Sequence, residues 1–307
     1  MAEAPKNYVC TLSNQEADDL TRYAQNIGGV VGYFVNDKTI TIENLTSKNV
    51  RIGDNATSNF RQTVYMGGLI GYGNSAYLRN SMATNFTMDE KIAQAVSEKP
   101  IYIGGIAGDF SGIAFDAVVI NDSKAQFTYE ANPDVAGTET YVNKMAIEIA
   151  SSGTSSDLYM GGAFGRLSKL YTAYDDMPIY IGNIPIRSDE NPFGFIEMAG
   201  LTATGHYKIP NISNALVADV NVKLTSNMGA KTSYIGGLIG YSNGPIYNAV
   251  TYGNMEVSTQ NDAYIGGLIA HSSNDFIQNA YSNRNITFVD YSATVHTNSL
   301  YVGGAFG

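Results

Sequence analysis

Aspartate side chains are the first candidates for chemistry in this 307-residue chain. Polysaccharide-cleaving enzymes use pairs of carboxylates, and calcium sites are built largely from carboxylate and carbonyl oxygens. The aspartates that could gather on one face of a repetitive fold are Asp109, Asp116, Asp122, Asp175, Asp176 and Asp189. They belong to no recurring set of acids and bases, so we expect solvated carboxylates in turns.

The histidines and the familiar catalytic motifs also give no site. His206, His271 and His296 lie at unrelated offsets from the repeats of the chain, so they do not form one column of metal ligands. The sequence lacks His-Glu-x-x-His, the Gly-x-Ser-x-Gly turn and the Gly-Lys-Ser/Thr phosphate loop. We therefore expect no catalytic residue, no metal and no cofactor.

A short phrase recurs along the whole chain: aromatic, apolar, Gly-Gly, two apolar residues, then Gly. Its first glycine is Gly28, Gly67, Gly104, Gly161, Gly236, Gly266 and Gly303, at intervals of 39, 37, 57, 75, 30 and 37 residues. Intervals of this size are typical of repeat architectures, in which each unit buries its apolar face against its neighbours. The 75-residue interval suggests an eighth, worn copy at Met198-Ala199-Gly200-Leu201, and the 57-residue interval suggests an insertion within 121–157.

If the units are stacked coils, equal positions form columns. The glycine pairs would form columns without side chains, which permit a tight corner or close approach of another backbone. A tyrosine two places before the first glycine would form a ladder of stacked rings, for stability or as a carbohydrate-binding strip. An asparagine turn follows about ten residues later. The glycine columns would contain Gly67, Gly68, Gly104, Gly105, Gly161, Gly162, Gly236, Gly237, Gly266, Gly267, Gly303 and Gly304. The tyrosine ladder would contain Tyr65, Tyr102, Tyr159, Tyr234, Tyr264 and Tyr301, and the asparagine turns would contain Asn80, Asn248 and Asn279.

These patterns predict an all-β fold: a right-handed parallel β-helix, or β-solenoid, of about eight coils spanning 27–307. The composition agrees, since 32 glycines, 22 tyrosines and only 15% charged residues favour many short strands. We expect residues 1–26 to cap the N-terminal end, with a short helix over 14–26. At the other end, residues 300–307 read as the opening strand of a further unit, so we expect a longer polypeptide or an edge covered by another chain.

The cores at 67–71 and 236–240, followed by the asparagine turn and by Gly253-Asn254, resemble GLUG-motif repeats. That family occurs in bacterial surface and secreted proteins, including adhesins and the N-terminal regions of some immunoglobulin-cleaving metalloproteases. The resemblance implies a β-solenoid scaffold at the cell surface or outside the cell. It brings no catalytic residues to this chain.

Charge limits the partners. The net charge of −10 argues against a binder of nucleic-acid backbones, which needs a basic face. Cys10 is the only cysteine, so no internal disulfide can form. The sequence contains no run of 18 apolar residues, so it predicts no membrane-spanning helix.

We expect an extracellular structural or adhesive module, whose partner would be a host or neighbouring-cell glycan or protein. The alternatives are a polysaccharide-processing β-helix enzyme and a subunit of a self-assembling filament or sheath that associates end to end.

Overall fold

The computed structural model describes most of the chain, and its described residues form strands and turns without a helix. They are residues 8–10, 25–48, 50–52, 57–58, 62–84, 87–92, 99–120, 127–128, 140–141, 145–152, 157–168, 184–186, 194–196, 212–218, 220–228, 232–244, 246–259, 262–273, 277–288 and 299–307. The helix expected over 14–26 lies outside them except at its last two residues. Gln25 and Asn26 begin a strand, so a helix reaching residue 26 is wrong.

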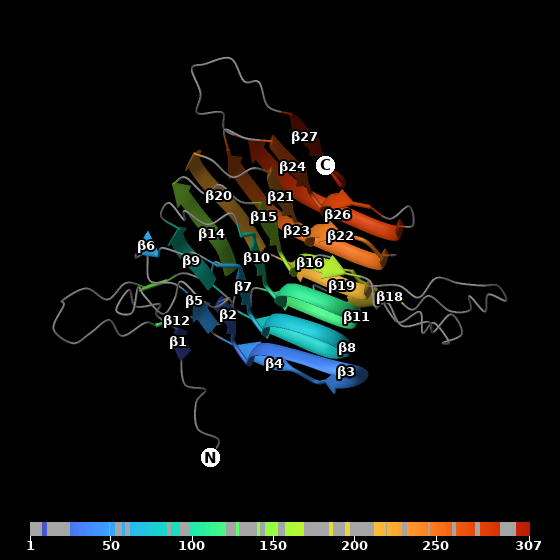
Figure 1. Cartoon of the computed structure of the whole chain (residues 1–307). Helices are drawn as coiled ribbons and strands as arrows, with labels where there is room; N and C mark the ends of the chain where they lie inside the picture. Colours follow the sequence, from blue (N-terminus) through green and yellow to red (C-terminus); the bar gives the residue numbers. More distant parts are fainter. Residues whose placement is uncertain are drawn as a thin grey trace.

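A seven-stranded parallel sheet holds one strand from each clear copy of the repeated phrase. Its strands are β2 (Gln25–Gly28), β7 (Val64–Gly67), β10 (Ile101–Gly104), β15 (Leu158–Gly161), β21 (Thr232–Gly236), β24 (Asp262–Gly266) and β27 (Leu300–Gly303). They stack in sequence order, from blue near the N-terminus to red near the C-terminus (Figure 1). The first glycine of each phrase lies opposite the first glycine of the next.

A sixteen-stranded sheet forms the rest of each coil. The strands that follow the Gly-Gly turn are β3 (Val31–Glu43), β8 (Ile70–Thr84), β11 (Ala107–Ile120), β16 (Phe164–Ser168), β22 (Ile239–Ser242) and β25 (Ile269–Ser272). Later parts of the coils are β4 (Thr46–Lys48), β19 (Ile212–Ala218), β23 (Ile246–Ser258) and β26 (Ile277–Phe288). The last side contains β1 (Tyr8–Cys10), β5 (Val50–Ile52), β6 (Thr57–Ser58), β9 (Thr87–Ile92), β14 (Met145–Ser152) and β20 (Val220–Met228).

Two antiparallel hairpins stand apart from these parallel sheets. β12 (Phe127–Thr128) pairs with β13 (Thr140–Tyr141), between β11 and β14. β17 (Ile184–Ile186) pairs with β18 (Gly194–Ile196), between β16 and β19. Each hairpin therefore falls within one of the two longest repeat intervals.

The worn copy near Ala199 does not add a strand to the seven-stranded sheet. β15 pairs directly with β21, so Gly161 lies opposite Gly236 and no strand from 198–201 can lie between them. Met198 and Leu201 themselves fall outside the described residues. The later part of that interval does keep its expected register, because Ile212 pairs with Ile246 and Leu216 with Val250. The prediction of an eighth unit there is therefore wrong for this sheet, because no additional strand lies between β15 and β21.

The core follows from the alternation of side chains along each strand. Met66, Ile103, Met160, Ile235 and Ile265 occupy the same position on consecutive coils and are fully buried. A second buried column follows the Gly-Gly turn: Leu69, Ile106, Ala163, Leu238 and Leu268. Both columns pack coil upon coil, so each unit covers the apolar side of its neighbour.

The glycine pairs are explained by close backbone approach. A Cβ on Gly67 would lie 1.9 Å from the carbonyl oxygen of Ile70, which closes the same turn. A Cβ on Gly237 would lie 2.0 Å from the carbonyl oxygen of Gly267 in the next coil. Neither glycine has a positive φ, since Gly253 is the one described glycine that does. Space, and not backbone conformation, requires glycine here.

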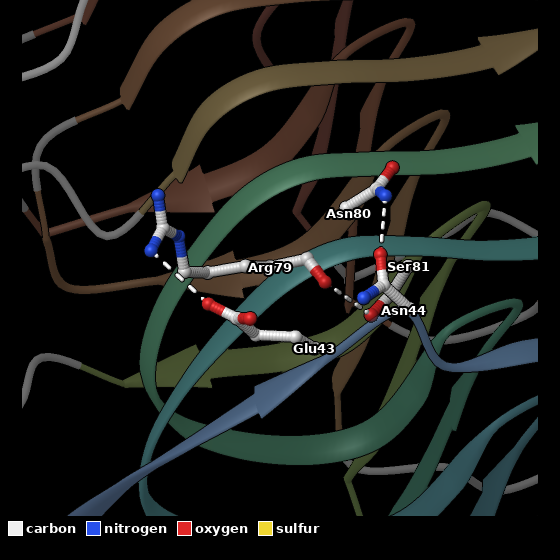
Figure 2. A network of polar contacts seen from close by, with 5 residues as sticks. All are labelled: Glu43, Asn44, Arg79, Asn80 and Ser81. Atoms are coloured by element: carbon white, nitrogen blue, oxygen red, sulfur yellow. Dashed lines mark hydrogen bonds and ion pairs between the residues drawn. The ribbon is translucent and has the colours of Figure 1, made fainter.

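The asparagine turn has the opposite requirement. Asn44, Asn80 and Asn279 have φ values of 58°, 47° and 54°, in the left-handed region that asparagine tolerates better than most residues. The Nδ2 of Asn80 donates to the Oδ1 of Asn44 in the coil below at 2.6 Å, and Arg79 pairs with Glu43 beside it (Figure 2). Asn248 lies at the same position in β23, and its side chain is outside the described part of the structure.

Candidate functional site

Six tyrosines form a continuous ladder along the seven-stranded sheet. In this tyrosine ladder the centroids of consecutive rings are 5.2, 4.8, 4.8, 5.2 and 4.7 Å apart, and their planes differ by at most 14°. Five of the six tyrosines directly precede a residue of the buried column, so their side chains point to the opposite, outer face of the sheet, and the sixth, Tyr301, stacks on Tyr264. The members are Tyr65, Tyr102, Tyr159, Tyr234, Tyr264 and Tyr301.

A second row of side chains packs along the ladder. It comes from the strands that follow the Gly-Gly turn, and each member directly follows the last glycine of the phrase or, once, an alanine. Tyr72 lies edge-on to Tyr65 at 4.9 Å, and His271 lies edge-on to Tyr264 at 5.0 Å. The second row consists of Tyr33, Tyr72, Asp109, Arg166, Tyr241 and His271.

Asp109 and Arg166 form an ion pair in the middle of this otherwise aromatic row. The Nε of Arg166 donates to Oδ1 of Asp109 at 2.9 Å, and its Nη2 donates to Oδ2. The guanidinium also covers the ring of Tyr102, with its Cζ 4.5 Å from the ring centroid. Asp109 is only 2% exposed, so the carboxylate depends on this arginine.

Burial shifts the proton affinities of this region. It raises the pKa of Tyr65 to about 12 and raises the pKa values of Tyr102 and Tyr159 further. Burial also raises the pKa of Asp109, against the opposing effect of the hydrogen bonds and charge of Arg166. For Arg166, burial lowers the pKa, but the hydrogen bond and charge of Asp109 outweigh it and leave the pKa above its ordinary value.

Of the six candidate aspartates, Asp109 is the one whose side chain the structure describes. Asp109 is not a solvated turn carboxylate, because it lies in β11 and is buried against Arg166; that expectation is wrong for this residue. Asp116 belongs to the same strand, but its side chain lies outside the described part, as do Asp122, Asp175, Asp176 and Asp189. Within the described residues, no three His, Cys, Asp or Glu side chains are placed to hold a metal ion.

Sequence reasoning found the tyrosine ladder but missed the second row. His206 and His296 are outside the described residues, while His271 stacks on Tyr241 at 5.4 Å. A signal for the row was present, since the residue after the last glycine is Tyr33, Tyr72 or Tyr241 in three copies. Alternation of side chains predicts that such a residue faces outward beside the ladder.

The stacking geometry limits what the ladder can bind. Sugars stack on the open face of an aromatic ring, but here each inner ring has both faces covered by its neighbours. Tyr102 is nearly closed to solvent, at 4% exposure, because Arg166 lies over it as well. The inner rungs therefore offer no open ring face on which a sugar could stack.

No family model, no curated protein and no solved structure matches this chain. In the part of the chain that the structure describes, no helix is long and apolar enough to cross a membrane.

Proposed function

We propose that this chain is an extracellular structural or adhesive module, a stiff β-solenoid that carries no catalysis of its own. The solenoid is right-handed, with one coil for each strand of the seven-stranded sheet. The resemblance of its repeats to GLUG motifs supports a place at the bacterial cell surface or outside the cell. A glycan or protein on a host or neighbouring cell would be the partner of an adhesive module.

The observation that carries this proposal is that the aromatic and charged side chains of the tyrosine ladder and the second row contact one another. In the tyrosine ladder and the second row, rings stack on rings, and the buried Asp109 is bound to Arg166. These contacts join one coil to the next. Side chains that are engaged in this way stiffen the stack, and the carboxylate of Asp109 is held by its ion pair.

Surface location is tested by labelling intact cells of the source organism with an antibody against this chain, with and without protease treatment. We expect labelling of unpermeabilised cells and its loss after proteolysis. Labelling only after permeabilisation would contradict an extracellular role.

Absence of catalysis is tested with a panel of polysaccharides, by measuring release of reducing ends and unsaturated products. We expect none above that of buffer. Turnover that disappears in Asp116→Asn would establish the polysaccharide-processing alternative.

End-to-end assembly is a second candidate, favoured by the last coil. Its apolar side chains are about half exposed: Leu300 45%, Tyr301 49%, Val302 49% and Phe306 46%. Paired edges elsewhere in the sheet bury such residues, so a strand from a second copy would cover them. Sedimentation should then show concentration-dependent growth that Val302→Lys abolishes, and a strictly monomeric wild type would contradict it.

A further inference from the structure

We propose that the tyrosine ladder is a site of oxidative modification, at which neighbouring coils become joined by dityrosine bonds. The oxidant is hydrogen peroxide used by a haem peroxidase, or an equivalent one-electron oxidant. The inference does not depend on the proposed structural or adhesive role.

The ladder places phenols side by side on consecutive coils. Tyr264 and Tyr301 have ring centroids 4.7 Å apart with planes 8° from parallel, and Tyr234 follows at 5.2 Å and 7°. Such stacking aligns equivalent atoms, so the carbons ortho to each hydroxyl face each other. Rungs two coils apart are separated by about 9.6 Å, twice the strand spacing, which is too far for direct coupling.

Access for an oxidant differs along the ladder. Tyr301 is 49% exposed, whereas Tyr102 is 4% exposed beneath Arg166. We therefore expect the links to concentrate between Tyr234, Tyr264 and Tyr301. Close stacking also lets an unpaired electron move between rings, so oxidation of one exposed phenol can lead to coupling at the next pair.

Each of two tyrosines loses one electron and its hydroxyl proton, which gives two phenoxyl radicals. The radicals join through a carbon–carbon bond between ortho carbons, and the two displaced ring protons move to the phenoxyl oxygens and restore both aromatic rings. Two protons and two electrons leave overall, and they reduce one molecule of hydrogen peroxide to two molecules of water.

Tryptophan, cysteine and the methionines next to the ladder do not compete with its phenols for the oxidising equivalent. The chain has no tryptophan and one cysteine, Cys10, which lies in β1 and so outside the ladder sheet. Met66 and Met160 neighbour the ladder in sequence but are fully buried on the opposite face of the sheet. The readily oxidised groups on this face are therefore the phenols of the ladder and of the second row, among them Tyr301 at 49% and Tyr33 at 59% exposure.

Two variants with equal numbers of tyrosines test the proposal. Both carry Tyr72→Phe and Tyr241→Phe, which removes second-row phenols close to the ladder. The alternating variant adds Tyr102→Phe, Tyr234→Phe and Tyr301→Phe, so no two adjacent rungs are tyrosines. The block variant instead adds Tyr65→Phe, Tyr102→Phe and Tyr159→Phe, which leaves Tyr234, Tyr264 and Tyr301 adjacent. Phenylalanine preserves the ring stack in both.

Each dilute protein is treated with peroxidase and hydrogen peroxide, and dityrosine is measured by its fluorescence and by mass spectrometry of cross-linked peptides. We expect the block variant to retain most of the wild-type dityrosine yield. The yield of the alternating variant should be at least fivefold lower than that of the wild type. Equal yields in the two variants would overturn the proposal.

Where a variant fails to fold, as judged by circular dichroism, the wild-type protein alone decides. Links mapped between adjacent rungs in the monomer, and lost in urea, support the proposal. Links that involve mainly Tyr281 or other tyrosines outside the ladder, or that join separate molecules, overturn it.

Discussion

The Gly-Gly corner differs from the remainder of each coil in how strictly the coils match. We define the Gly-Gly corner as the seven-stranded sheet, its glycine turns and the first four residues after each turn. There, seven strands pair residue for residue. In the later parts of the coils, register shifts occur between Val35 and Ile40, between Ser111 and Gly112, and between Ser151 and Ser152.

The cause of the difference is what lies at the contact between coils. At the corner, backbones approach so closely that a Cβ would collide at the glycine positions between stacked coils, which restricts those positions to glycine. Farther along the coil, side chains fill the interior, and different combinations of apolar residues can fill the same volume. Sequence repetition therefore marks where backbone meets backbone.

The largest effect is expected from Arg166→Met at the corner. The substitution leaves the buried Asp109 carboxylate without its partner, which typically costs about 3 to 5 kcal/mol. Lys223→Met, which breaks the exposed pair with Glu256, is the matched change outside the corner and should cost less than about 1 kcal/mol. Urea denaturation measures both.

A double variant sharpens this prediction. Asp109→Tyr with Arg166→Tyr gives the second row the residue that it has at Tyr72 and Tyr241. It should recover most of the stability lost in Arg166→Met. If the double variant is as unstable as Arg166→Met, stacked tyrosine rings cannot replace the ion pair at these two positions.

Gly237→Val should have the next largest effect. Its Cβ would lie 2.0 Å from a backbone oxygen, and overpacking against backbone costs about 3 kcal/mol or more. Gly304→Val is the control, because a Cβ at Gly304 meets nothing within 4 Å. Similar melting temperatures for the two variants would contradict the requirement for space.

Tyr159→Ala should come third. The ring stacks at 4.8 Å on both Tyr102 and Tyr234, and two such pairs contribute about 2 kcal/mol beyond area burial. Tyr281→Ala, at an exposed position on β26, should change the free energy of unfolding by less than about 0.5 kcal/mol. Chemical denaturation distinguishes them, and equal losses would argue against an energetic role for the ladder.

A smaller effect is expected from alkaline pH. The pKa of Tyr65 rises from 10.0 to about 12 on folding, so between these values the folded state holds a proton that the unfolded state has lost. Stability should therefore fall as pH rises through this window. The fall should be shallower in Tyr65→Phe, as measured by urea midpoints, and parallel curves would contradict the assignment.

The smallest effect is expected at the asparagine turn, outside the corner. Asn80→Ala places alanine at a φ of 47° and removes the bond to Asn44, for about 1 kcal/mol. Asn80→Gly keeps the backbone conformation and removes only the bond. If the two variants are equally stable, the positive φ contributes nothing.

The sequence predicted the parallel stack and the columns because stacked coils align equal positions, so spacing alone sets the register. The worn copy near Ala199 misled because a short apolar-Gly phrase arises easily, and only strand pairing shows whether it joins a sheet. The Asp109–Arg166 pair was missed for a physical reason. Tyr72, Asp109, Arg166 and Tyr241 occupy the same position in consecutive coils. Because aspartate and arginine differ in chemistry from tyrosine and from each other, the sequence does not show that they share this position.

The direct pairing of β15 with β21 has a consequence for how such a protein can change through evolution. The chain leaves β16 at Ser168 and rejoins the same coil in β19 at Ile212, yet Gly161 and Gly236 stay in register. Doubling the length of a loop adds only about 0.6 kcal/mol of closure entropy. A coil can therefore acquire a long new segment by insertion and remain in the stack. The inserted segments can change in length and sequence while the stacked strands keep their register.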